Sequence, residues 1–196
     1  MKPWLAFPSI IGLSAALLFL AERRRLHRER VTELAIAVCR AHTPDGVKDY
    51  VTCSPPGDAF TSGLPSEAIL GRLLRPPEPG GRITPAVFEP NPVFADFLHE
   101  VIARRGPQVA GLKAEARRQR EGWVYLIDQR ARTPQGHVPP EDVIGAFEVA
   151  SGKIVPGSYQ RSHKHLVLSN DGFTRLGAEL QACLLEELAN RMKAIR

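Results

Sequence analysis

Two closely spaced histidines are the first residues whose types and spacing suggest chemistry. His163 and His165 are separated by one residue, and alternate residues of a strand point to one face, so both imidazoles could approach one metal ion. Asp171 or His137 would then supply a third ligand. Lys164 and the surrounding loop-forming residues favour two exposed histidines instead. The sequence therefore does not establish a metal site. His163, His165 and Asp171 are the candidate ligands if a metal ion is bound.

A second group of residues suggests recognition. The segment after residue 155 combines a proline, a glycine, an aromatic residue and several hydrogen-bonding groups directly after an expected strand. Loops that a rigid scaffold positions often carry binding sites, although ordinary loop composition explains the same residues without a function. Together with the preceding polar loop, this segment predicts a polar binding face made of Tyr159, Gln160, Arg161, Arg130 and Arg132.

Catalytic and cofactor motifs are missing from the sequence. A zinc-protease helix needs a second histidine four positions after the first, but Ala103 stands four positions after His99. Gly80 and Gly81 have no downstream Lys-Ser/Thr pair, and no serine is bracketed by glycines as in a nucleophile elbow. The 3 cysteines form no C-x-x-C pair. We therefore expect no catalytic residue and no cofactor.

The elements that must position these residues begin with an apolar N-terminal segment. No charged residue occurs from Pro3 to Ala21, a length that as a helix comes close to the roughly 30 Å hydrocarbon core of a bilayer. Five arginines follow between Arg23 and Arg30, and such clusters favour the cytoplasmic side. Residues 1–30 are thus predicted to be a single-pass signal-anchor with a basic juxtamembrane segment, and the rest of the chain to be cytoplasmic.

Other interpretations of this segment are less consistent with its residues. A cleaved signal peptide needs a small residue at the third position before the cleavage site. If cleavage followed Ala21, this position would be the bulky Phe19. A buried helix carries polar residues along one face, whereas only Ser9 and Ser14 interrupt the apolar run. A lipoprotein signal is set aside because Val38 rather than a small residue precedes Cys39. Whether the segment is cleaved stays open.

The charge distribution indicates the kind of partner. The formal net charge is +5, of which residues 22–30 carry +3 and the residues after Arg30 carry +1. A juxtamembrane cluster attracts anionic head groups at about 1 kcal/mol per basic side chain, whereas nucleic-acid binding needs clustered cations on the folded domain. We therefore expect the lipid bilayer and a protein as partners, and no nucleic acid.

Residues 31–82 and 83–196 are expected to differ in character. The first segment is predicted to extend the anchor helix to about residue 41 and then to form a linker rich in proline and glycine, with a short helix over 65–74. The second is predicted to be a compact α+β domain. Its helices are expected at 92–105, 112–121 and from about 173 onward, and its strands at 123–127, 143–149, 153–159 and 165–168.

The expected domain is a small antiparallel meander of three to four strands packed with helices. Asn91 is predicted to cap its first helix, and Gly152 to turn a hairpin. Leu180, Leu184 and Leu188 share one face of the terminal helix, which is expected to cover the strand at 123–127.

These patterns favour a membrane-anchored protein that acts by binding, as an adaptor or as an accessory subunit of a membrane complex. The alternative is a membrane-tethered enzyme, for example a metal-dependent hydrolase, using the region of His137, His163, His165 and Asp171.

Overall fold

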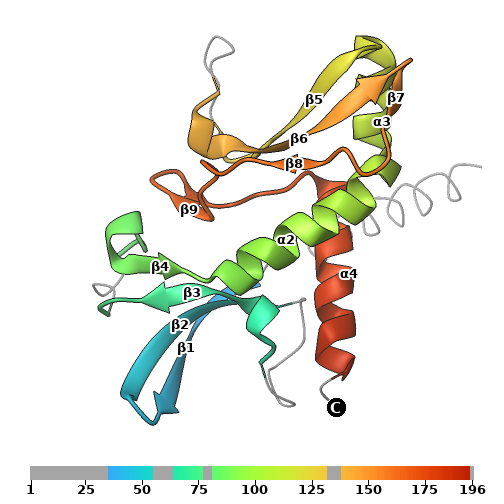
Figure 1. Ribbon diagram of the computed structural model, residues 1–196. Helices are drawn as coiled ribbons and strands as arrows, with labels where there is room; N and C mark the ends of the chain where they lie inside the picture. The colour runs from blue at the N-terminus through green and yellow to red at the C-terminus, as the bar shows by residue number, and fades with distance from the viewer. Residues whose placement is uncertain (1–34, 55–63, 77–80, 132–137, 195–196) are drawn as a thin grey trace, which may run out of the picture.

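The computed structural model describes residues 35–54, 64–76, 81–131 and 138–194, which form an α+β fold of antiparallel sheets and helices (Figure 1). The expected anchor at residues 1–30 lies outside these ranges, as do Arg132 and His137. Among the helices within them, none has both the length and the apolar character needed to cross a bilayer.

The first sheet is formed by the N-terminal part of the described chain. Its strands pair antiparallel in the order β1-β2-β3-β4. Gly46 begins the second strand at φ 110°, a conformation that glycine adopts without strain. The strands are β1 (Ala35–Thr43), β2 (Gly46–Ser54), β3 (Ile69–Leu73) and β4 (Phe88–Pro90), with short 3-10 helices at Ser66–Ala68 and Pro85–Val87.

Two expectations for residues 31–82 are wrong. Strand β1 stands where an extension of the anchor helix was predicted, and strand β3 occupies most of the short helix predicted over 65–74. Ile36 and Val38 are two residues apart, which is the period of a strand, and pairing with β2 gives the backbone of β1 its hydrogen-bond partners. In β3, a Cβ at Gly71 would lie 2.3 Å from the Glu89 carbonyl oxygen, so the glycine permits close pairing with β4.

The second sheet is centred on β6. β5 pairs with one edge of β6, and β7 and β8 pair with the other. Gly152 has φ 74° in the hairpin between β6 and β7, as predicted. The strands expected over 153–159 and 165–168 are mostly loop. The strands are β5 (Gly122–Ile127), β6 (Val143–Ala150), β7 (Lys153–Ile154), β8 (Gln160–Arg161), and the separate pair β9 (Leu168–Ser169) and β10 (Gly172–Phe173).

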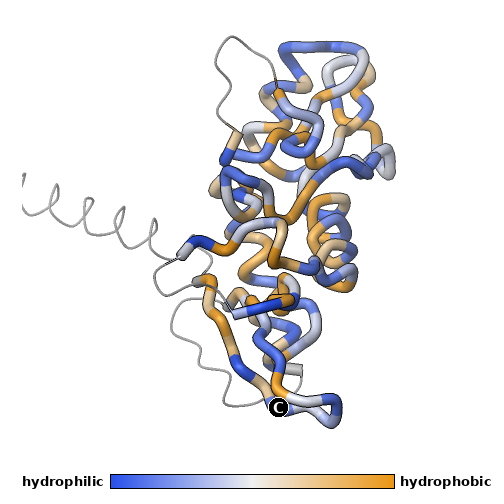
Figure 2. Tube along the Cα trace, turned by 90° about the vertical axis from the view of Figure 1, so that its left-hand side faces the viewer, coloured by the Kyte–Doolittle hydropathy of each residue, from blue (hydrophilic) through white to orange (hydrophobic). Residues whose placement is uncertain are grey.

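Within the described ranges, three α-helices connect and cover these sheets. They are α2 (Pro92–Arg105), α3 (Ala110–Gln119) and α4 (Ala178–Ala194), with short 3-10 helices at Gly106–Gln108 and Pro140–Asp142. The Asn91 side chain accepts a hydrogen bond from the Val93 amide and caps α2, as predicted. Along the described chain, hydrophobic and hydrophilic residues alternate at short intervals, which is typical of elements with one buried face (Figure 2).

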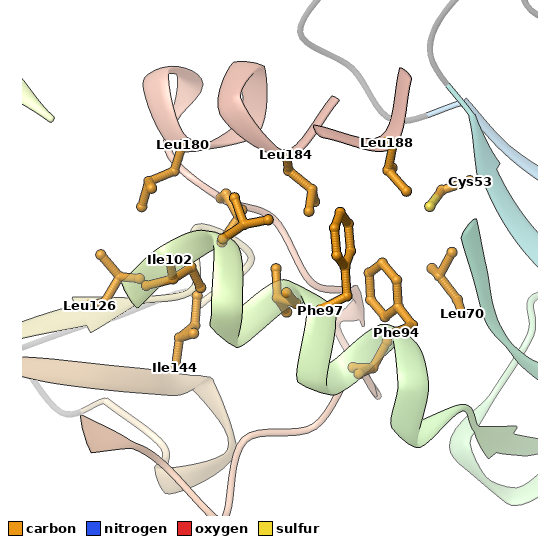
Figure 3. Close-up of a cluster of buried hydrophobic side chains, with 14 of the residues drawn as sticks. Cys53, Leu70, Phe94, Phe97, Ile102, Leu126, Ile144, Leu180, Leu184 and Leu188 are labelled. Carbon is orange, nitrogen blue, oxygen red and sulfur yellow. The ribbon is translucent and has the colours of Figure 1, made fainter. Parts of the chain in front are cut away.

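Helix α2 lies between the two sheets, and α4 runs beside it (Figure 1). The leucines of α4 project towards α2 rather than covering β5 as expected (Figure 3). Cys53 and Leu70 of the first sheet lie at one end of this cluster, and Leu126 and Ile144 of the second sheet at the other (Figure 3). The segment predicted to be a linker therefore supplies part of the core, because the inner face of β2 and β3 packs against the helices.

Leu184→Ala is expected to lower the free energy of unfolding by about 2–5 kcal/mol, because the leucine is 1% exposed and its loss leaves a cavity. Lys193→Ala, an exposed position on the same helix, should stay within about 0.5 kcal/mol. Urea denaturation measures both values. Equal midpoints for the two variants would contradict the packing of α4 against α2.

Candidate functional site

Arg130, predicted to belong to a binding face, is buried. Its side chain is 1% exposed, and its Nε donates to Oδ1 of Asp142 at 2.8 Å. The two Nη atoms donate to backbone carbonyl oxygens, namely those of Leu166 (2.5 Å), Gly172 (2.8 Å), Glu141 (3.2 Å) and Val167 (3.4 Å). All five N–H groups of the guanidinium thus have acceptors within the protein, and none is left for a ligand.

Asp128 completes the surroundings of Arg130. Its buried carboxylate accepts hydrogen bonds at Oδ1 from the backbone amides of Arg130 at 3.0 Å and Arg175 at 2.9 Å. The Arg130 side chain and this carboxylate join the end of β5, the start of β6 and the loops on both sides of β9 and β10. We infer that Arg130 fixes the position of the 166–175 segment rather than binding a partner.

His165 and His163 occupy different surroundings. The His165 side chain is 2% exposed, with Nε2 at 3.4 Å from Oδ2 of Asp128 and 3.2 Å from Oγ1 of Thr174. His163 lies exposed in a turn, and Asp171 is also exposed. The two histidines do not share one face of a strand, and of the two exposed histidines that the sequence favoured, only His163 is exposed. Within the described residues, no three His, Cys, Asp or Glu side chains are grouped so that they could hold a metal ion.

The contacts of His165 do not form a catalytic triad. In a triad, the carboxylate and the nucleophilic hydroxyl contact opposite nitrogens of the imidazole, so that one nitrogen is oriented while the other takes the proton. Here the Asp128 carboxylate and the Thr174 hydroxyl both approach Nε2. The arrangement therefore stabilises the loop and does not activate Thr174.

Tyr159 pairs with His99, a residue that the sequence analysis did not assign to a site. The Tyr159 hydroxyl and Nδ1 of His99 lie 2.8 Å apart, and the tyrosine ring packs on Phe147 with centroids 5.0 Å apart. Gly145 permits this approach, because a Cβ there would lie 2.6 Å from the hydroxyl. Burial raises the pKa of Tyr159, which keeps the hydroxyl protonated.

Gln160 and Arg161 lie on β8 and are exposed. Arg161 Nη1 is 2.7 Å from Oδ1 of Asp96 on α2, so its charge is paired at the surface. Of the five residues predicted to form one binding face, Tyr159, Gln160 and Arg161 are consecutive, Arg130 is buried and Arg132 lies outside the described residues. None of the described ones lines either of the two hollows described below.

His99 makes the stability of the fold depend on pH. Burial, followed by the positive charges of His165 and Arg161, lowers the pKa of His99 to about 4 from its ordinary 6.5. The unfolded chain therefore takes up this proton at a higher pH than the folded chain does, and stability falls as pH drops from about 6.5 towards 4.

His99→Gln is expected to reduce the loss of stability between pH 7 and pH 5, because glutamine keeps a polar group near Tyr159 but does not titrate. Urea midpoints at the two pH values measure this loss. His42→Gln, an exposed histidine on β1, is the control and should leave the difference as it is in the parent protein. A loss of equal size in all three proteins would contradict the assignment to His99.

A cleft of about 540 Å³ lies between the first turn of α4, strand β10 and the start of β1. Its polar lining comes from three parts of the sequence, namely Arg82, Gln129, and the segment that contains Asp171, Thr174, Arg175 and Gln181. Gln129 and Arg175 lie side by side, because the backbone N–H of Gln129 donates to the backbone carbonyl oxygen of Arg175 at 2.9 Å. The Arg130 contacts described above therefore fix one wall of this cleft.

A second hollow of about 420 Å³ lies beside the β1–β2 hairpin, and most of its cations are already paired. Arg40 pairs with Asp49 at 2.8 Å, and Arg72 pairs with Glu89. In the first cleft, by contrast, no hydrogen bond or ion pair joins the side chains of Arg82 and Arg175 to another residue that the structure describes. The cleft at α4 is thus the better candidate site.

Comparison of the chain with protein-family models, curated proteins and solved structures found no match. The function is therefore argued from the cleft and its surroundings.

Proposed function

We propose that this protein is a membrane-tethered module that acts by binding, as an accessory subunit of a membrane complex, with its folded domain on the cytoplasmic side. The observation that carries the proposal is the cleft of about 540 Å³ at the start of α4, lined by Arg82 and Arg175, whose side chains have no ion-pair partner among the described residues. A ligand pocket with a few convergent polar groups is typical of a binding site.

The contacts of the titratable side chains favour binding over the alternative of a hydrolase. The alternative relies on His163, His165 and Asp171, of which His165 is enclosed by Asp128 and Thr174 while the other two are exposed. Tyr159 and His99 pair with each other, and burial keeps the tyrosine protonated and the histidine neutral. The side chains of His165, Tyr159 and His99 therefore contact other residues of the fold rather than a substrate.

The membrane tether is proposed from the uncharged run between Pro3 and Ala21. Ile36 lines the cleft and follows Ala21 by 15 residues, which span at most about 50 Å when fully extended. The cleft would therefore stay within about 50 Å of the end of the anchor, near the head groups and any membrane-embedded partner.

The position of β1 at the edge of the described sheet supports a protein as partner. This strand lies at the edge of its sheet, and Ile36 and Val38 are 39% and 46% exposed. Edge strands offer unpaired backbone groups to another chain, and exposed apolar residues add contact area. Ile36 also lines the cleft, so the edge and the cleft form one continuous surface.

Affinity purification of the full chain from gently solubilised membranes tests the proposal. We expect a stoichiometric protein partner that is lost with Arg175→Glu and retained with Lys193→Glu, an exposed charge change at the far end of α4. Deletion of residues 1–30 should release the protein from membranes. A partner that Arg175→Glu retains, or hydrolase activity that His165→Ala abolishes in a folded protein, would overturn the proposal.

A further inference from the structure

The cleft at the start of α4 carries an excess of positive charge. Arg82 and Arg175 line it with exposed side chains, and Asp171 is the acidic residue that lines it. Neither guanidinium is neutralised by another described residue, whereas Arg40 and Arg72 beside the second hollow are paired with carboxylates. An anion in the cleft would therefore meet two charge-assisted donors at once.

Gln181 supplies a donor that lacks an acceptor. It lies on the first turns of α4, lines the cleft and is 6% exposed. Its Nε2 is the one buried side-chain nitrogen or oxygen in the described part of the chain without a hydrogen-bond partner. Since an unpaired buried amide costs free energy, an acceptor atom bound next to it would recover that cost.

Helix α4 presents its N-terminal end to the same cleft. Ala178, the first residue of the helix, lines the cleft, and the first backbone amides of a helix have no acceptor within it. Glu179, the acidic residue of that turn, is engaged elsewhere, since its Oε2 accepts from the Ala110 amide at 2.7 Å. The positive end of the helix dipole therefore adds to the two arginines.

From these three observations we propose that the cleft binds a phosphate group carried by a small molecule or by a lipid head group. The proposal rests on the binding function above and names its ligand chemistry. The two guanidinium groups attract a phosphate group, with their charge partly offset by Asp171, and Gln181 and the first turn of α4 supply further donors to its oxygens. The cleft is larger than a phosphate group. Ile36, Phe173 and Leu176 also line it, and they would contact a less polar part of the ligand.

The test uses the full chain in a nonionic detergent and isothermal titration with inorganic phosphate and with glycerol 3-phosphate. Arg175→Gln and Gln181→Leu are each expected to weaken binding about 10-fold or more. Lys193→Gln removes an equal charge outside the cleft and should leave binding unchanged. Gln181→Leu should also keep or raise the unfolding midpoint, which separates loss of a ligand contact from loss of the fold.

A second arm adds phosphatidic acid or phosphatidylcholine to the micelles. Phosphatidic acid binding that Arg175→Gln weakens, without binding of glycerol 3-phosphate, supports the proposal with a lipid as the source of the phosphate. Binding of the soluble phosphates with the same dependence supports it with a soluble source. If no probe binds, or if Arg175→Gln and Gln181→Leu bind like the parent protein, the proposal is overturned.

The two proposals fail in different ways. A partner that is still lost with Arg175→Glu, in a protein that binds no phosphate probe, leaves the binding function standing and overturns the phosphate assignment. If phosphate binding depends on Arg175 but the partner is retained with Arg175→Glu, the phosphate assignment stands and the proposed partner-binding function is overturned.

Discussion

Arg130→Met is expected to lower the free energy of unfolding by about 3–5 kcal/mol, because it breaks a buried ion pair from one side only. Asp128 and Asp142, whose side chains are 0% and 1% exposed, would remain without their positive partner. Four backbone carbonyl groups would also lose a donor. Methionine fills most of the volume of the arginine side chain, so the loss is electrostatic more than steric.

Urea denaturation at neutral pH measures this effect. Arg161→Met removes a guanidinium that is exposed and paired with Asp96, and it should cost less than about 1 kcal/mol. Adding Asp128→Asn and Asp142→Asn to Arg130→Met should recover part of the stability, because the uncompensated charges are then gone. If Arg130→Met and Arg161→Met unfold at the same urea concentration, Arg130 does not hold the loops together.

The elements that the sequence predicted well are those with a long and unambiguous period. Helix α2 begins after Asn91 and buries Phe94, Phe97 and Leu98 at helical spacing, so length, cap and pattern agree. The hairpin at Gly152 was also predictable, since glycine tolerates its positive φ. Strand β1 was mistaken because Ile36 and Val38 stand among alanines, which fit a helix by propensity but a strand by period.

The functional surface was harder to predict than the fold. Arg130 looks in the sequence like any loop arginine, and its burial depends on two carboxylates and four carbonyl groups that only the folded chain brings together. Arg82 is far in the sequence from Arg175 and Gln181, and none of the three stands in a local motif. The role of His99 is visible only in the folded chain, where the residue before β8, Tyr159, lies beside it. Sites assembled from distant positions leave no spacing to recognise.

A chain that begins at Ile83 is expected not to fold cooperatively, although the sequence predicts a compact domain over 83–196. Val51, Cys53 and Leu70 belong to the same core cluster as the leucines of α4, and they are 0%, 0% and 2% exposed. Removing them uncovers the ends of α2 and α4 that face the first sheet (Figure 3). β4 would also lose its partner β3.

The matched control is a chain that begins at Val31, which lacks the expected anchor but keeps every described strand and should show a single cooperative unfolding transition. Near-ultraviolet circular dichroism and urea denaturation compare the two, and the shorter chain should bind a hydrophobic dye through its exposed apolar surface. Burying one Leu or Val side chain contributes roughly 1.5–3 kcal/mol, and net stabilities of whole domains are about 5–15 kcal/mol, so losing several core residues removes the margin. A cooperative transition at a similar midpoint in both chains would show instead that the helices and the second sheet form a complete core without β1, β2 and β3.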